Sequence, residues 1–268
     1  MKMMNLVVAV LILTMATSSV MATQTLKLNT GYNHSLIVDA AYTPIPPATQ
    51  DNYWIKVWST APGFPAPSWA IPVSPAWFPT PLPDSNWINV QNSNASTYPS
   101  NSTTPGYHIY RKCFCLQQGF KNATMNLDFR ADDGVAIWFN STWIQPFTAG
   151  NWWQSTPYTK TVNSGFRVGR NCMFVLIGDI GTYTGFNLAG SVTANGLLQT
   201  PAFGTAGTFQ PCGCGGPAGG QAMRIGEDGD DDKKIIEEIV KSVKSNEKRN
   251  VEVMKKAAEM PRTSDNKN

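Results

Sequence analysis

Charged residues are scarce in most of this sequence, and glutamate is absent from the larger part of it. Residues 23–222 contain seven aspartates, nine lysines or arginines and no glutamate, whereas residues 223–268 contain eleven acidic and eleven basic residues. The formal net charge of the whole chain is +3 at pH 7. The chain therefore divides into a nearly uncharged body and a charged tail, and it lacks the concentrated basic charge of a nucleic-acid-binding protein.

Long hydrophobic runs are missing after the first 22 residues. No later segment reaches the roughly 18 consecutive apolar residues that a transmembrane helix needs. At the start of the sequence, Lys2 precedes an apolar run at residues 6–15, and Val20 and Ala22 supply small residues at the positions that a signal peptidase inspects. This arrangement predicts a signal peptide at residues 1–22, a mature chain that begins at Thr23, and a secreted, extracellular protein without a membrane span.

Recognised catalytic motifs are absent as well. The sequence contains no GxSxG, HExxH or phosphate-binding loop motif. Its two histidines, His34 in a glycosylation motif and His108 at the start of a strand-like run, are more typical of surface or packing residues than of general bases. Glycoside hydrolysis needs two carboxylates that face each other across a substrate, and the body has no glutamate to act as partner. We therefore predict that the protein is not an enzyme.

The body shows the two-residue period of β-strands. Runs such as YWIKVW, YHIYRKCFCL, GVAIWFN and NCMFVLIGD are separated by turns rich in glycine, asparagine and aspartate. Eight prolines among residues 59–83 exclude a helix or a central strand there and predict an extended loop. The pattern predicts an all-β fold, with a single β-sandwich or jelly roll over residues 23–201.

A Gly- and Cys-rich linker at residues 202–226 is predicted to join this body to a charged tail at residues 227–268. From Ile235 onward, apolar residues recur at spacings of three and four, which predicts a C-terminal amphipathic helix. A coiled coil that makes a homo-oligomer is a weaker alternative, because Asn246 and Asn250 would lie on its seam. A solvated, partly disordered tail is the remaining alternative.

Five cysteines in a chain with an export signal predict disulfides. Cys113 and Cys115 are two residues apart in a strand-like run, so they point to the same face, and a bond between them would be strained. Each is expected to pair elsewhere, with Cys172, Cys212 and Cys214 as candidates. An odd number of cysteines leaves one thiol that is free or bonded to another chain.

Five Asn-x-Ser/Thr motifs predict glycosylation on surface loops if the protein is made by a eukaryote. The candidate acceptors are Asn33, Asn94, Asn101, Asn122 and Asn140.

Residues 107–192 carry a resemblance to a known family. The run YHIYRKCFCL, then ATMNLDFRADDGVAIWFN, then GFRVGRNCMFVLIGD and GFNLAGSV, resembles the galactose-binding-like jelly roll of secreted, glycan-associated proteins. ADDGVAIWFN also resembles the core of PA14-type glycan-binding domains, which share an Asp-Asp pair. Asn140-Ser141 stands where such families carry Asn-Gly. The resemblance implies a glycan or glycoprotein as partner.

The ADDG segment, Ala131 to Gly134, has three interpretations. The first is a β-turn corner, because aspartate bonds to its own backbone and glycine tolerates positive φ. The second is a calcium site formed by Asp132 and Asp133 with backbone carbonyls, although calcium needs six to eight oxygens. The third is direct contact between these carboxylates and a sugar hydroxyl. Neighbouring carboxylates on a turn point apart, which excludes a catalytic pair.

Loops rich in proline, threonine and asparagine carry several aromatic side chains that could stack on a sugar. The alternative is that these rings fold back and cover the ends of the sandwich. The segment NWWQSTPY at residues 151–158 is the strongest candidate for a ligand-binding loop. The candidate ligand-binding residues are Trp77, Trp143, Asn151, Trp152, Trp153 and Tyr158.

Together these features favour a secreted, non-enzymatic glycan-binding module whose tail oligomerises or binds a partner. Apart from calcium, no cofactor is expected. The alternative is a structural extracellular-matrix or surface protein that uses the same fold for packing, with the odd cysteine forming cross-links.

Overall fold

The structure, a computed structural model, describes most of the body and the tail. The described residues are 22–33, 43–47, 49–60, 68–73, 81–89, 106–152, 154–180, 184–198 and 227–259. The predicted signal peptide up to residue 21 and the predicted linker lie outside these ranges. So do residues 61–67 and 74–80 of the predicted proline-rich loop. Residues 68–73 of that loop form a strand that pairs on both of its edges, so the prediction that proline excludes a central strand there was wrong.

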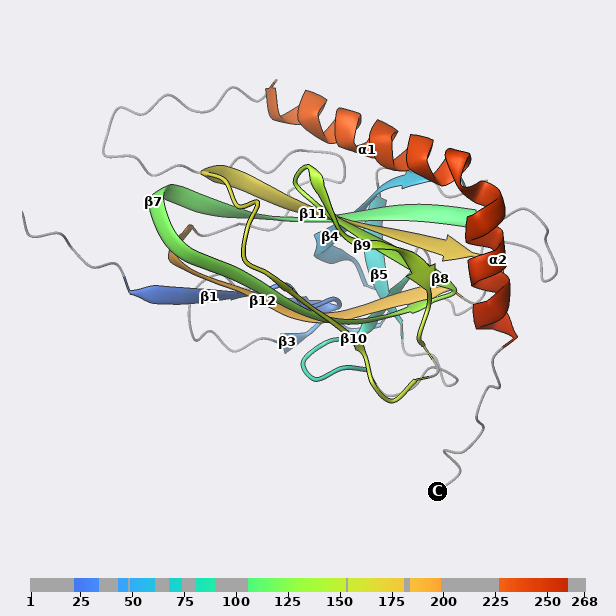
Figure 1. The fold of residues 1–268 in the computed structure, drawn as a ribbon. Helices are drawn as coiled ribbons and strands as arrows, with labels where there is room; N and C mark the ends of the chain where they lie inside the picture. Colours follow the sequence, from blue (N-terminus) through green and yellow to red (C-terminus); the bar gives the residue numbers. More distant parts are fainter. Residues whose placement is uncertain are drawn as a thin grey trace, which may run out of the picture.

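Strands account for the described body, and two helices account for the described tail (Figure 1). The strands are β1 (Thr23–Lys27), β2 (Tyr32–Asn33), β3 (Thr43–Pro44), β4 (Asp51–Ser59), β5 (Ser68–Val73), β6 (Trp87–Asn89), β7 (Gly106–Asp132), β8 (Gly134–Phe139), β9 (Thr142–Ala149), β10 (Tyr158–Val162), β11 (Gly169–Asp179) and β12 (Gly185–Leu198). The helices are α1 (Glu227–Ser245) and α2 (Glu247–Ala258). The all-β sandwich with a C-terminal helical segment is thus confirmed.

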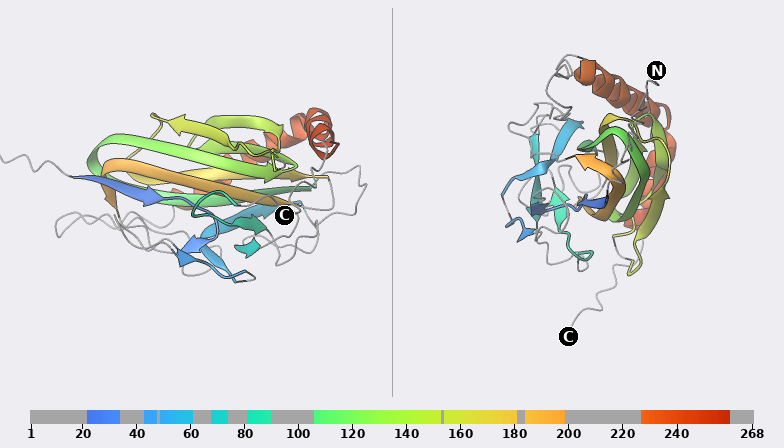
Figure 2. Two further views of the ribbon diagram at one scale, coloured as in Figure 1. Left: turned by 90° about the horizontal axis from the view of Figure 1, so that it is seen from below. Right: turned by 90° about the vertical axis from the view of Figure 1, so that its left-hand side faces the viewer.

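The 27-residue strand β7 belongs to both layers of the sandwich. Its first part, Gly106–Leu116, pairs with β11, and β4 lies along its other edge. Its second part, from Met125 to Asp132, lies between β10 and β12. Between the two parts the strand bends (Figure 2), and Gly119 and Asn122 adopt positive φ angles of 78° and 54° there. Glycine and asparagine are the residues that accept this conformation most readily.

The main core fills the space between the layers. Side chains from alternate positions of β7, β8, β11 and β12 point into it, as the pleat of a strand requires. All six residues of β8 are buried, so this strand is covered on both faces. The largest rings in this core are those of Trp54, Phe114, Phe129, Phe139 and Phe186.

A second apolar core lies on the outer face of the layer formed by β7, β8 and β11. Helices α1 and α2 run across this face (Figures 1 and 2). Ile235, Ile239 and Val243 of α1 and Met254 of α2 are buried against side chains such as Phe174. The predicted amphipathic helix is therefore confirmed as two helices, and its apolar face packs on this chain's own sheet. No helix in the described part of the chain is long and apolar enough to cross a membrane.

The helices meet at Asn246, which is exposed, whereas Asn250 is 4% exposed. The two asparagines therefore do not share a seam, contrary to the heptad expected from the sequence. The face that a coiled coil would use is occupied by the sheet.

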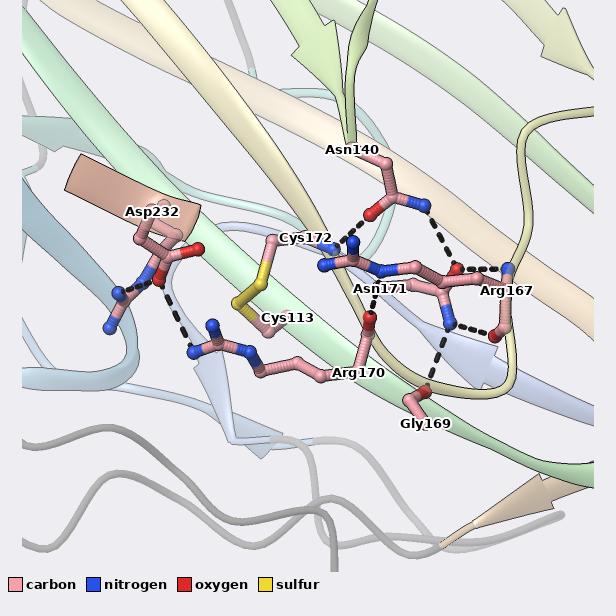
Figure 3. The surroundings of a disulfide bond; sticks show 9 residues. Cys113, Asn140, Arg167, Gly169, Arg170, Asn171, Cys172 and Asp232 are labelled. Carbon is pink, nitrogen blue, oxygen red and sulfur yellow. Dashed lines mark hydrogen bonds and ion pairs between the residues drawn. A yellow bond between two sulfur atoms is a disulfide. The ribbon is translucent and has the colours of Figure 1, made fainter. Parts of the chain in front are cut away.

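Polar contacts also hold α1 to the sheet. Cys113 and Cys172 lie opposite each other on β7 and β11 and form a disulfide (Figure 3). Beside it, Asp232 of α1 accepts from Nη1 of Arg111 at 2.5 Å and lies 3.2 Å from Nη1 of Arg170. All three charged side chains are at most 3% exposed. One carboxylate between two guanidinium groups thus joins the helix to both central strands of the layer.

The register of β7 and β11 explains the disulfide pairing that the sequence left open. Cys113 bonds to Cys172, one of its three candidate partners. Cys115 is disulfide-bonded too, and Cys212 and Cys214 lie outside the described residues.

We predict that Asp232→Asn destabilises the protein by about 3–5 kcal/mol, because it leaves two buried guanidinium groups without their shared carboxylate. Urea unfolding of the mature chain measures this. Asp231→Asn is the matched control, since Asp231 is the exposed neighbour on the same helix and its loss should cost less than about 0.5 kcal/mol. Equal effects of the two substitutions would show that the ion pairs do not anchor the helix.

Candidate functional site

The ADDG segment forms a corner between β7, which ends at Asp132, and β8, which begins at Gly134. The peptide bond between Asp132 and Asp133 is cis, and both residues are only 3% exposed. Gly134 does not adopt positive φ, contrary to the sequence-based reason for a glycine here. Instead, a Cβ at this position would lie 2.5 Å from the ring of Phe147, so close packing requires the glycine.

Hydrogen bonds hold the corner to β11 and to the start of β12. Asp133 donates its backbone N–H to the carbonyl of Gly178 at 2.9 Å, and its carboxylate Oδ2 accepts from the backbone N–H of Ile180 at 3.0 Å. Thr184 donates its hydroxyl to the Asp132 carbonyl at 3.5 Å. Asp179, which lies between Gly178 and Ile180 in the chain, is fully buried.

The loop that follows β9 is fastened to the same corner. Gly150 donates to the carbonyl of Asp133, and the backbone N–H groups of Asn151 and Trp152 donate to the carbonyl of Ala131 at 3.0 and 3.2 Å. The Asn151 side chain accepts from the N–H of Ala131 at 3.3 Å and donates to two further carbonyls. Loop and corner therefore form one hydrogen-bonded unit.

Arg130, on the strand that leads into the corner, adds a side-chain contact. Its Nη2 donates to the carbonyl of Ser155 at 2.5 Å. Burial lowers the pKa of Arg130 from its ordinary value. Both ends of the loop, at residues 150–152 and at Ser155, are thus hydrogen-bonded to residues at the end of β7 or directly after it.

The candidate ligand residues are divided between two places. Asn151 and Trp152 lie at the corner and are 0% and 4% exposed, so they support the loop from within. Tyr158 is half-buried there, and it donates its hydroxyl to the carbonyl of Ala149 at 3.0 Å. Trp143 lies instead on the outer face of the sheet, with its ring 4.7 Å from that of Trp138. Trp77 and Trp153 lie outside the described residues.

The predicted ligand-binding loop, residues 151–158, also contains exposed polar side chains that were not among the candidate ligand-binding residues. Gln154, Ser155 and Thr156 are exposed at its tip and offer amide and hydroxyl groups to solvent. Their polar composition alone is common in loops, so only the fastening of the loop beside the two aspartates distinguishes them.

Carboxylates at the corner supply only part of a metal coordination shell. Within the described ranges, no three or more His, Cys, Asp or Glu side chains are grouped so as to hold a metal ion. Asp132 and Asp133 would need backbone or ligand oxygens to complete the six to eight that calcium takes.

A second polar group lies on neighbouring strands. Ser59 Oγ of β4 lies 2.9 Å from Nδ1 of the fully buried His108 of β7. Burial, together with the charge of Lys56, lowers the pKa of His108 to about 3. Burial also lowers the pKa of Lys56 to about 8. At neutral pH the imidazole is therefore uncharged and is a very weak base.

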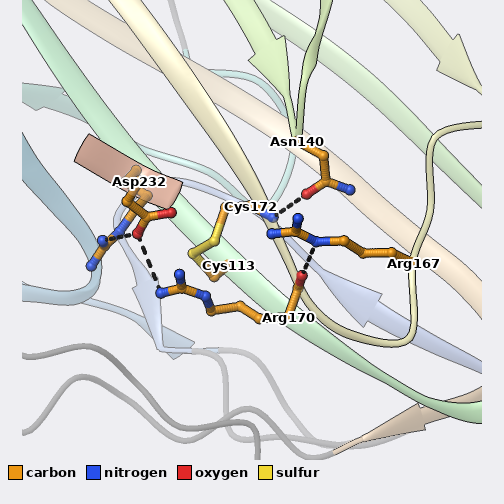
Figure 4. A network of polar contacts seen from close by, with 7 residues as sticks. Cys113, Asn140, Arg167, Arg170, Cys172 and Asp232 are labelled. Carbon is orange, nitrogen blue, oxygen red and sulfur yellow. Dashed lines mark hydrogen bonds and ion pairs between the residues drawn. A yellow bond between two sulfur atoms is a disulfide. The ribbon is translucent and has the colours of Figure 1, made fainter. Parts of the chain in front are cut away.

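The candidate glycosylation sites differ in accessibility. Asn140 is 4% exposed, and its Nδ2 donates to the carbonyl of Gly165 at 2.8 Å and to Oδ1 of Asn171 at 3.0 Å. Its Oδ1 accepts from the backbone N–H of Cys172 (Figures 3 and 4). Both amide hydrogens are used within the fold, which argues against a glycan on Asn140. Asn33 and Asn122 are exposed, and Asn94 and Asn101 lie outside the described residues.

Asn140 has instead a structural role. With Ser141 it forms the two-residue turn between β8 and β9, where it adopts a φ of 50°. The network in Figure 4 continues through Arg167, whose Nε donates to the carbonyl of Arg170 at 2.8 Å. The β8–β9 hairpin is thereby tied to the turn before β11.

No family model matches the sequence, and no curated protein matches it. Among solved structures, the PA14 domain of the MpAFP antifreeze protein is similar at 20% identity and a TM-score of 0.24, over 32% of this chain and 43% of that one. A PA14 sugar-binding domain from an RTX adhesin has 17% identity and a TM-score of 0.22, over 33% of this chain and 47% of that one.

An exo-β-1,3-galactanase from Phanerochaete chrysosporium has 11% identity and a TM-score of 0.26, over 59% of this chain and 32% of that one. Each match thus spans less than half of the other protein. At such TM-scores these similarities assign this chain to no family.

We predict that the His108 imidazole stays neutral in the folded protein down to about pH 4, whereas an ordinary histidine protonates near pH 6.5. The unfolded chain binds this proton below pH 6.5 and the folded chain does not, so the group lowers stability as the pH falls from 6.5 towards 3. NMR titration of the ring measures the pKa, and His108→Gln assigns its signal. Urea unfolding measures the free energy of unfolding at each pH. Between pH 7 and pH 5 this free energy should fall by about 2 kcal/mol less in His108→Gln than in the wild type. A pKa near 6.5 in the folded protein would contradict this prediction.

Proposed function

We propose that the protein is an exported, non-catalytic carbohydrate-binding module. In this proposal, calcium binds at Asp132 and Asp133, and the sugar binds beside it at the tip of the loop formed by residues 150–157. The observation that carries the proposal is the fastening of this loop to the backbone of residues 131–133. It fixes a loop with exposed amide and hydroxyl groups to the corner that contains two neighbouring aspartates.

Calcium suits the chemistry of the corner. It is a hard cation that prefers carboxylate and carbonyl oxygens. Asp132 and Asp133 are neighbours in the chain and supply two carboxylates at this corner. Sugar hydroxyls are neutral oxygen ligands that can complete the shell of the calcium ion.

The loop is suited to sugar recognition because its backbone is already fixed. Binding costs less when the groups that contact the ligand are ordered beforehand. Gln154, Ser155 and Thr156 provide donors and acceptors for hydroxyl groups, while the buried ring of Trp152 supports the loop from below.

Two features favour binding over catalysis. Asp132 and Asp133 are neighbours in the chain, and the carboxylate of Asp133 is held by the N–H of Ile180 rather than facing a second acid across a gap. Ser59 and His108 are placed as a nucleophile and base could be, but an imidazole with a pKa of about 3 accepts a proton poorly at neutral pH.

A glycan array probed with the full mature chain, in calcium and in EDTA, tests the proposal. We expect calcium-dependent binding, which Asp132→Asn and Asp133→Asn weaken by about tenfold or more because each removes a charged calcium ligand. Asparagine keeps a side-chain oxygen that can still accept from Ile180, so the corner itself should persist. Asp128→Asn on the same strand is the matched control and should bind as the wild type does.

Unchanged binding in EDTA and in both corner variants would exclude a calcium site here, and no binding by the wild type would exclude the carbohydrate function. Circular dichroism and the urea midpoint of each variant verify that it is folded.

One observation favours the alternative, a structural protein with intermolecular cross-links. Cys113, Cys115 and Cys172 are all disulfide-bonded, and the chain contains five cysteines, so pairing within one chain leaves one thiol over. If this alternative is correct, the secreted protein should migrate as a disulfide-linked dimer or larger species in a gel without reductant, and it should bind no glycan. A monomer with one alkylatable thiol would contradict it.

A further inference from the structure

A cavity of about 180 Å³ lies where helices α1 and α2 meet, between them and the outer face of the sheet. It is formed by the tail and the sheet together, and it is distinct from the proposed calcium site at Asp132 and Asp133. The residues that line it and bear on its chemistry are Trp143, Phe147, Ser242, Asn246, Arg249 and Asn250.

Aromatic rings from β9 form the wall of the cavity on the sheet side. Trp143 packs edge-on against Trp138, and Phe147 packs edge-on against Tyr107, with 6.3 Å between the ring centres. Phe147 lies over two glycines, Gly134 and Gly178, where an added Cβ would be 2.5 and 2.9 Å from its ring. Both aromatic rings are therefore held in place by the sheet beneath them.

Polar groups lie on the helix side and at the base. Ser242 contributes a hydroxyl and Asn250 an amide; Asn246 contributes its amide oxygen, because its Nδ2 donates to the carbonyl of Ser242 and to Oγ of Ser245. Behind them, the buried hydroxyl of Tyr107 lies beside the amide of Asn250 and interacts with it. Burial raises the pKa of Tyr107 to about 12, and the nearby amide of Asn250 partly offsets this rise.

Arg249 provides the charge of the cavity. It is exposed on α2 and is the one charged residue among those that line the cavity. Glu247, whose charge raises the pKa of Tyr107 further, is not among the lining residues. A ligand with a carboxylate can therefore pair with Arg249 at the mouth while its ring lies between Trp143 and the amides.

We propose that this cavity binds one sugar ring that carries a carboxylate, that is, a uronic acid, either free or at the end of a glycan. The volume is below the roughly 300–1,000 Å³ of pockets for drug-sized ligands, so it suits a single ring rather than a longer chain. A sugar ring has an apolar face for the indole and several hydroxyls for the polar groups of Ser242, Asn246 and Asn250. An aromatic acid has the charge and the flat face but leaves these polar groups without partners.

Isothermal titration of the full mature chain with glucuronate, glucose and benzoate tests the proposal. We expect glucuronate to bind more tightly than the other two. Arg249→Met should weaken glucuronate binding by about tenfold or more and remove its advantage over glucose, because a charged hydrogen bond is lost. Lys248→Met is the matched control, since Lys248 is exposed on the same helix but does not line the cavity.

Asn250→Ala should weaken glucuronate and glucose alike, because it removes a hydrogen bond to the ring. Methyl glucuronide distinguishes a terminal glycan residue, which it mimics, from a free sugar acid. The proposal would be overturned if glucose bound as tightly as glucuronate or if benzoate bound more tightly. It would also be overturned if Arg249→Met had no effect or if none of the three compounds bound. The calcium corner is tested separately, since Asp132→Asn and EDTA should leave glucuronate binding unchanged.

Discussion

The structure depends on burying both faces of the layer formed by β7, β8 and β11. Its inner face packs in the sandwich, and its outer face carries large apolar side chains such as Ile109, Phe174 and Leu176, which are almost completely buried. Exposing these would forfeit roughly 1.5–3 kcal/mol for each side chain. The helical tail covers them, so it is part of the folded unit rather than an appendage.

Buried ion pairs determine the position at which helix α1 packs on the sheet. An apolar stripe alone would allow a helix to slide along the sheet, whereas Asp232 must reach both Arg111 and Arg170. Buried ion pairs often contribute little net stability, but a misplaced one is expensive, because it leaves a charge in an apolar setting. The single carboxylate therefore fixes where α1 lies, and with it the position of α2 and the cavity at their junction.

Local patterns in the sequence were sufficient to predict most of the strands, the sandwich and the amphipathic helices, because the spacing of apolar residues and the composition of turns are short-range properties. They did not predict β5, which lies within the proline-rich segment and is paired on both edges. They could not predict where the helices pack, since Asp232, Arg111 and Arg170 resemble ordinary surface charges until the tail folds back over the sheet. The candidate site shows the same limit. A corner was the first of three interpretations of ADDG, but the need for Gly134 comes from Phe147, thirteen residues away. Trp152 lies inward beside Asn151, which bonds to the strand beneath it.

The corner and the cavity lie on either side of one pair of hydrogen-bonded strands. Gly134 and Gly178 are register partners in β8 and β11, and Asp133 bonds to the carbonyl of Gly178. On the tail side, added Cβ atoms at these glycines would lie within 3.1 Å of Met254 of α2 and within 2.9 Å of the ring of Phe147. With no side chain in between, the packing of the tail bears directly on the backbone that carries Asp133. Displacing α2 would therefore remove a wall of the cavity and, in the same movement, the support behind the corner.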